Sequence, residues 1–135
     1  MQISTVQAAG GKISLRVNGD TVFIAGEIDQ LTPRDFMGGF FEIVHSMALG
    51  EGLAEVKVDV TELAFLNSSG IKEVLSWILR RNRIPPEKKY KMNFLFDPAV
   101  AWQPITLPRL RDLDPDCIVL TPVSRPHQIP LHAVR

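Results

Sequence analysis

One stretch in the middle of the chain constrains the fold more than any other, because its hydrophobic period changes within a few residues. From Val56 to Val60 apolar residues alternate with polar ones, which is the period of a β-strand. After the Asn-Ser-Ser-Gly segment at residues 67–70, apolar residues recur at the helical spacing i, i+3, i+4, i+7, i+8 from Ile71 to Leu79. The sequence therefore predicts a strand, a tight apolar link and a helix that begins at two serines.

The predicted helix start has a chemistry of its own. Asn67 and the serines can accept hydrogen bonds from the free backbone N–H groups of the first helical turn. The N-terminal end of a helix also carries a partial positive charge, which favours an anion or a phosphate. The hydroxyl group of Ser68 is thus expected at a position where phosphorylation is tolerated.

Hydrophobic period and turn residues predict the other elements of a single domain over residues 13–121. The expected elements are a flexible lead-in at 1–12, a hairpin at 13–26, a helix from about 33 to 50, the strand and helix described above, a strand at 91–96, a short helix between 99 and 113, a strand at 117–120 and a proline-containing tail at 122–135. This order, β-β-α-β-α-β-α-β, predicts an α/β fold with βα crossovers and a mixed sheet that includes the N-terminal hairpin.

The first predicted helix has a clear start signal and an unusual interior. Thr32 is expected to cap it, Pro33 to occupy its first position and Asp35 to complete the cap. Gly38 and Gly39 lie inside the helix, where each costs about 1 kcal/mol relative to alanine. We expect these glycines to allow close packing of the helix on the sheet.

Charge and cysteine content narrow the choice of partners and compartment. The formal net charge is +0 and the pI is about 6.8, so no global field attracts the chain to nucleic acid or to a membrane. Cys117 is the single cysteine, which fits a reducing compartment, and neither a leader peptide nor an apolar run of membrane-spanning length is apparent. We expect a soluble cytoplasmic protein whose partners are proteins or small molecules.

One segment departs from this neutral balance. Residues 80–91 contain six bases and the single acid Glu87 around a double proline that ends the second helix. Two explanations are open: a docking patch for an acidic partner, or cations at a helix C-terminus followed by a solvated loop.

Catalytic signatures are weak in this sequence. Ser68 lies at a strand-to-helix turn, but Leu66 stands where a hydrolase nucleophile elbow has glycine. His45 falls within a helix and the other two histidines in the tail, so none is placed as a base, and metal-ligand spacing is absent. Asp29 and Asp59 stand near strand ends, where they either belong to a site or cap loops. We therefore expect neither enzymatic activity nor a cofactor or metal.

Three segments together resemble a known family. They are Gly-Glu-Ile-Asp at 26–29 after the hairpin, Val-Asp-Val at 58–60, and Phe-Leu-Asn-Ser-Ser-Gly-Ile at 65–71. Over residues 13–121 the chain resembles the STAS domain of bacterial anti-sigma factor antagonists, whose phosphoacceptor turn usually reads Asp-Ser-Ser-Gly. The resemblance implies the STAS fold.

The resemblance also assigns roles to residues. Ser68 corresponds to the phosphorylated serine of the family, and Asp29 to a second acid near that site. Asn67 replaces the usual acid, which either eases phosphorylation or alters the switch. Together with Ser69 and Gly70, Asp29 and Asn67 would form the environment of the phosphosite and contact the partner.

What the resemblance implies is a non-catalytic signal-transduction module that regulates transcription by partner switching. In such systems a serine kinase that doubles as an anti-sigma factor phosphorylates the antagonist, a PP2C-type phosphatase reverses this, and only the unphosphorylated form holds its partner. Two alternatives are open. The chain could be a constitutive STAS-like subunit of a larger assembly, such as a lipid-transport complex of the inner membrane, or an activator of a signalling enzyme such as a nucleotide cyclase.

Overall fold

The chain folds around one mixed β-sheet. The computed structural model describes residue 1 and residues 4–123. The strands of these residues are β1 (Ser4–Ala8), β2 (Ile13–Asn18), β3 (Thr21–Ile28), β4 (Glu55–Asp59), β5 (Leu63–Leu66), β6 (Lys91–Phe96) and β7 (Ile118–Pro122). They lie in the order β1-β2-β3-β4-β6-β7, and β5 pairs with β3 beyond the end of β4. The pairs β1·β2 and β2·β3 are antiparallel, whereas the other pairs are parallel.

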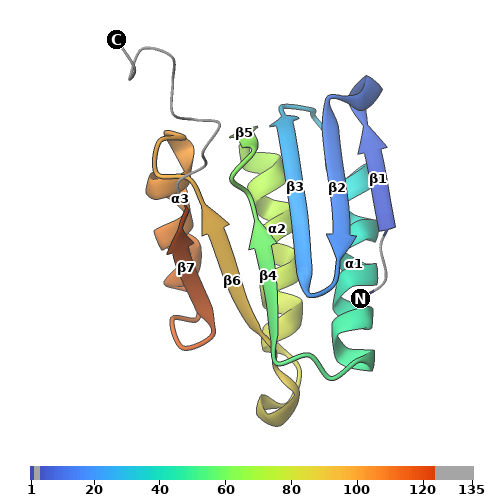
Figure 1. Ribbon diagram of the computed structural model, residues 1–135, viewed down its shortest axis with the longest axis vertical. Coiled ribbons are helices and arrows are strands. Elements are labelled where there is room, and N and C mark those ends of the chain that lie inside the picture. Colours follow the sequence, from blue (N-terminus) through green and yellow to red (C-terminus); the bar gives the residue numbers. More distant parts are fainter. Residues whose placement is uncertain (2–3, 124–135) are drawn as a thin grey trace.

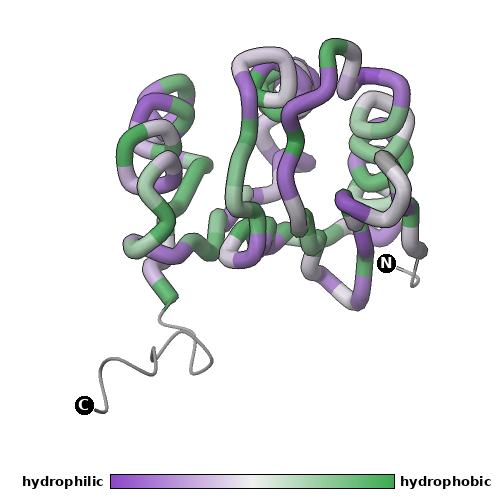
Figure 2. Tube along the Cα trace, turned by 90° about the horizontal axis from the view of Figure 1, so that it is seen from above, coloured by the Kyte–Doolittle hydropathy of each residue, from purple (hydrophilic) through white to green (hydrophobic). Residues whose placement is uncertain are grey.

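The helices cover a single face of this sheet. They are α1 (Arg34–Gly50), α2 (Ser68–Asn82) and α3 (Trp102–Arg111), with short 3-10 turns η1 (Ala9–Gly11) and η2 (Pro86–Lys88). The three α-helices of the described residues lie behind the sheet in Figure 1, and the view from above in Figure 2 shows them together on one side. None of the helices in residues 4–123 is both long and apolar enough to cross a membrane. The fold therefore has two layers, helices on a sheet.

The predicted fold class is confirmed, and most elements lie where the sequence indicated. The hairpin of β2 and β3 turns at Gly19, whose φ of 65° is the left-handed conformation that a two-residue turn requires. Val56 and Val58 of β4 point into the core, as their alternation predicted. The expected double-proline stop also holds, since α2 ends at Asn82.

Two predictions about strands were wrong. The expected flexible lead-in contains β1, which pairs antiparallel with β2 and packs Val6 and Ala8 against the core. The expected apolar link before α2 contains β5, which pairs in parallel with the end of β3. Neither segment alternates clearly between polar and large apolar residues, and both strands are stabilised by partners elsewhere in the chain. The proline-containing tail lies outside the described residues beyond 123, and Pro122 belongs to β7.

The start of α1 differs in detail from the predicted cap. The helix begins at Arg34, and no side chain caps it. The Thr32 hydroxyl donates to the Asp35 carboxylate over 3.1 Å instead of accepting a backbone N–H. Thr32 and Asp35 therefore pair with each other through their side chains.

The position of β5, and with it the start of α2, depends on Gly26. Its φ is 107°, and a Cβ at this position would lie 2.0 Å from the carbonyl oxygen of Lys12. Its backbone N–H donates to the carbonyl of Glu62 over 3.0 Å, and the register of β3 against β5 shifts at the next residue. Gly26 therefore marks the irregularity after which β3 continues against β5.

Candidate functional site

Ser68 is the first residue of α2 and its side chain is exposed. The residue before it, Asn67, fixes the helix start in two directions. Its side-chain oxygen accepts a hydrogen bond from the backbone N–H of Gly70 over 2.8 Å, which is an N-cap contact. Its side-chain nitrogen donates to the carbonyl oxygen of Gln30 over 2.8 Å, and its backbone N–H donates to Ile28 over 2.9 Å. The Ser68 hydroxyl is therefore presented from a turn anchored to the end of β3.

Gly70 shows why this turn needs a residue without a side chain. It is buried, and a Cβ there would lie 2.4 Å from the Cδ1 atom of Leu66 and 3.2 Å from Ile28. Any larger residue would push the first turn of α2 away from β3 and β5. The absence of a Cβ thus allows α2 to begin in close contact with the sheet.

Asp29 lies on the adjacent loop, immediately after β3, and is exposed. Its carboxylate pairs with the Lys12 ammonium group at 3.0 Å and accepts a hydrogen bond from the Gln30 side chain at 3.0 Å. The hydrogen bond and the charge of Asp29 raise the pKa of Lys12 above its usual value. The backbone carbonyl of Gln30 in turn accepts a hydrogen bond from the side-chain nitrogen of Asn67. Gln30 therefore connects Asp29 to Asn67, the residue before Ser68.

Ser69 faces a hollow that the sequence did not predict. This hollow of about 180 Å³ lies between the β3–α1 loop and the first turn of α2, and it is lined by Leu31, Thr32, Pro33, Arg34, Ser69, Lys72 and Glu73. Leu31 is 93% exposed, the highest value among the exposed large apolar side chains, and Phe65 just before the turn is 46% exposed. The only sequence signal for Leu31 was an isolated apolar residue between two polar ones in a loop. Exposed apolar groups beside a serine turn form a surface suited to a protein partner.

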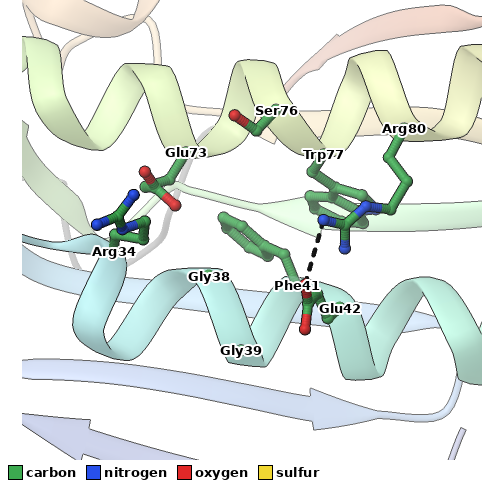
Figure 3. Close-up of a pocket in the computed structure, with 9 residues that line it drawn as sticks. All are labelled: Arg34, Gly38, Gly39, Phe41, Glu42, Glu73, Ser76, Trp77 and Arg80. Carbon is green, nitrogen blue, oxygen red and sulfur yellow. Dashed lines mark hydrogen bonds and ion pairs between the residues drawn. The ribbon is translucent and has the colours of Figure 1, made fainter.

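A larger groove continues from this hollow along the two helices. It measures about 350 Å³ and shares Arg34 and Glu73 with the hollow. Figure 3 shows these two residues toward one end and the Arg80–Glu42 ion pair, at 3.2 Å, toward the other. Phe41 and Trp77 lie between them, and their rings stack with centroids 4.7 Å apart.

The prediction that Gly38 and Gly39 allow close packing of the helix on the sheet was wrong. Gly38 and Gly39 line the groove between α1 and α2 instead of packing on the sheet (Figure 3). A Cβ on Gly38 would approach Arg34 at 3.2 Å and Glu73 at 3.4 Å, whereas one on Gly39 would meet nothing within 4 Å. Gly38 therefore keeps the space between the helices open, whereas Gly39 lies at an exposed part of the groove.

The other polar candidates are occupied with structural contacts. Asp59 accepts hydrogen bonds from the backbone N–H and the hydroxyl of Thr61, at 2.9 and 2.6 Å, so it caps the turn after β4. His45 is buried in α1, where its Nδ1 atom lies 2.7 Å from the hydroxyl of Tyr90. In the part of the chain that the structure describes, no three His, Cys, Asp or Glu side chains gather as a metal site would require.

Comparison with known proteins addresses the fold. No protein-family model and no curated protein sequence matches the chain. Among solved structures, SiaC of Pseudomonas aeruginosa is similar with a TM-score of 0.64 and 16% identity, over 92% of this chain and 98% of that one. An anti-sigma factor antagonist from Mycobacterium paratuberculosis is similar with a TM-score of 0.50 and 19% identity, over 90% of this chain and 87% of that one. The chain therefore has the STAS-like fold of the anti-sigma factor antagonists, as the sequence resemblance implied.

Proposed function

We propose that this chain is a non-catalytic regulatory module that binds other proteins, and that phosphorylation of Ser68 switches this binding. The observation that carries the proposal is the exposed serine at the capped start of α2, next to a hollow whose rim includes the exposed side chain of Leu31. The STAS-like fold supports it, because one protein of this fold is described as an anti-sigma factor antagonist.

The electrostatics of the turn explain how such a switch would work. A phosphate on Ser68 adds about −1.5 to −2 charges at pH 7. The module itself tolerates this charge, because the partial positive end of α2 lies there and Arg34 and Lys72 line the neighbouring hollow. An apolar partner surface packed over Leu31 would instead bury the phosphate without a counter-charge, which is strongly unfavourable. The unphosphorylated form is therefore the binding form.

Asn67 is compatible with this role. The amide supplies both an acceptor for the helix and a donor for Gln30, whereas a carboxylate at this position would supply acceptors only. It also places no negative charge beside the phosphate. By the family resemblance, the partners are a serine kinase that acts as an anti-sigma factor and a PP2C-type phosphatase.

The first test is a pull-down from a lysate of the native cells with three baits: wild type, Ser68→Ala and Ser68→Asp. Ser76, an exposed serine two turns further along α2, gives a matched control as Ser76→Asp. We expect wild type, Ser68→Ala and Ser76→Asp to recover the same kinase-like or regulatory partner, and Ser68→Asp to lose it. Mass spectrometry of the protein from these cells should locate the phosphate on Ser68.

Two results would contradict the proposal. A phosphate found only on another residue would remove Ser68 as the acceptor. Equal recovery of one complex by all four baits would make Ser68 a structural cap and would favour a constitutive subunit.

A further inference from the structure

A further concave surface lies at the end of the sheet opposite Ser68. It is a hollow of about 710 Å³ between the end of α1 and the turn η2, lined by Leu49, Gly52, Leu53, Ala54, Ile84, Pro85, Glu87, Lys88, Lys89 and Lys91. In Figure 1 this end carries η2 and the loop from α1 to β4, whereas β5 and the start of α2 lie at the other end. We call it the lysine hollow.

The charges around the lysine hollow are predominantly positive. Lys88, Lys89 and Lys91 form no ion pair within residues 4–123, and Glu87 is the single acid in the lining. The apolar lining residues Leu49, Leu53 and Ile84 are half-buried, so they form a recess and do not protrude. This recess fits an apolar side chain that is flanked by acidic groups.

The chain itself displays such a segment at the same end. The loop from α3 to β7 contains Asp112, Leu113 and Asp116, all exposed, and Leu113 is 47% exposed. Asp114 in this loop is already used, because it pairs at 3.2 Å with the fully buried guanidinium group of Arg81. That contact ties the loop to the end of α2. Figure 1 shows the loop and η2 at the same end of the sheet.

We propose that two copies of this chain associate through this end, with Leu113 of each copy in the lysine hollow of the other. Asp112 and Asp116 would face Lys88 and Lys89 of the second copy in both contacts. Since each copy contributes one acidic loop and one basic hollow, a two-fold axis between them satisfies both contacts with the same residues. The formal net charge of +0 means that no overall repulsion opposes the pairing.

The shape of this end favours a second copy over a membrane surface. A bilayer is entered by apolar side chains that protrude, whereas the apolar residues of the hollow are recessed. The protruding Leu113 lies between two aspartates, which anionic headgroups would repel. Association at this end would leave Ser68 accessible at the opposite end, so the dimer adds to the proposed switch and does not depend on it.

The test reverses the charges on each of the two surfaces. Sedimentation equilibrium of the purified full chain over a range of concentrations measures the dissociation constant of the dimer. Variant one carries Lys88→Glu and Lys89→Glu, and variant two carries Asp112→Lys and Asp116→Lys. We expect the wild type to reach twice the protomer mass of 15.1 kDa. Each variant alone should dissociate with a Kd raised roughly tenfold or more, and an equimolar mixture of the two should dimerise again because opposite charges then meet.

Two further variants keep the outcome clear. Lys72→Glu lies on α2 near the Ser68 end and should leave the dimer unchanged, whereas Leu113→Ser should weaken it without any charge change. Far-ultraviolet circular dichroism checks that every variant is folded. A wild type that stays monomeric up to about 1 mM, or a mixture of variants that fails to dimerise, would overturn the proposal. Binding of the monomeric wild type to phosphatidylserine vesicles, lost in Lys88→Glu with Lys89→Glu, would replace it with a membrane surface.

Discussion

The side-chain amide of Asn67 donates a hydrogen bond of 2.8 Å to the carbonyl oxygen of Gln30, 37 residues earlier in the chain. The oxygen atom of the same side chain accepts a hydrogen bond of 2.8 Å from the backbone N–H of Gly70. One asparagine therefore holds the start of α2 and the β3–α1 loop in a fixed relation, and the proposed phosphosite and Leu31 lie on the two elements that it joins.

Asn67→Asp should lower the free energy of unfolding by about 1–2 kcal/mol. The carboxylate keeps the cap and gains about 0.3–1 kcal/mol from the helix dipole, but it leaves the Gln30 carbonyl without its donor, which costs about 1–3 kcal/mol. Urea unfolding at pH 7 measures the change. Asn67→Ser keeps a capping oxygen but also loses the donor to Gln30 and gains nothing from the helix dipole, so this control should be at least as destabilised as Asn67→Asp. An Asn67→Asp protein as stable as wild type would show that the contact with Gln30 contributes no more than the helix dipole returns, about 0.3–1 kcal/mol.

Gly26→Ala should destabilise the protein far more than Gly19→Ala. Both glycines have positive φ, which costs a non-glycine residue about 1–2 kcal/mol. At Gly26 the added Cβ would also lie 2.0 Å from the backbone oxygen of Lys12, whereas at Gly19 it would meet nothing within 4 Å. We expect a loss of about 1–2 kcal/mol for Gly19→Ala and at least about 3 kcal/mol for Gly26→Ala, from chemical denaturation. Equal losses of stability in the two variants would mean that the backbone at Lys12 moves away from residue 26 at no cost in free energy.

Tyr90 should ionise only in strongly alkaline solution. Burial raises the pKa of its hydroxyl to about 12, and the chain contains a single tyrosine, so absorbance at 295 nm reports this group alone. In guanidinium chloride the same titration should have a midpoint near the usual value of about 10. Because the unfolded state releases this proton first, stability should fall as pH rises above about 10. A native titration midpoint near 10, with the far-ultraviolet spectrum still native, would contradict the buried position of Tyr90.

His45 should make the protein less stable in acid. Burial, with a smaller contribution from the charge of Arg80, lowers the pKa of His45 below its usual value. The indole N–H of Trp77 donates to the Tyr90 oxygen at 2.8 Å, so the Tyr90 hydroxyl is free to donate to the Nδ1 atom of neutral His45. The unfolded chain therefore takes up this proton first, and stability is lost as pH falls below about 6.5.

Urea unfolding of the wild type and of His45→Gln at pH 7.5 and 5.5 isolates this effect. The wild type should lose more stability than the variant on acidification, because only the wild type titrates at this position. An equal loss in both proteins would show that the pKa of His45 is the same in the folded and unfolded states.

Local patterns in the sequence were sufficient for several elements. The period change between Val56 and Leu79 placed β4 and α2, and the Asn-Gly-Asp turn at 18–20 placed the first hairpin. The capping role of Asn67 was also local, because its acceptor atom contacts an N–H only three residues away. Such signals depend on neighbours within one or two turns, which the chain itself brings together.

The tertiary structure decided what depends on residues far apart in the chain. It paired β5 with β3, placed Leu31 beside Ser69, and placed Gly38 and Gly39 along the groove between α1 and α2. It also gave the donor group of Asn67 a partner at Gln30. The sequence by itself thus determined the fold class and the candidate serine, whereas the surface around that serine required the packed chain. The physical reason is that a residue's local pattern states which face it needs to bury, but only long-range packing determines which groups lie opposite that face.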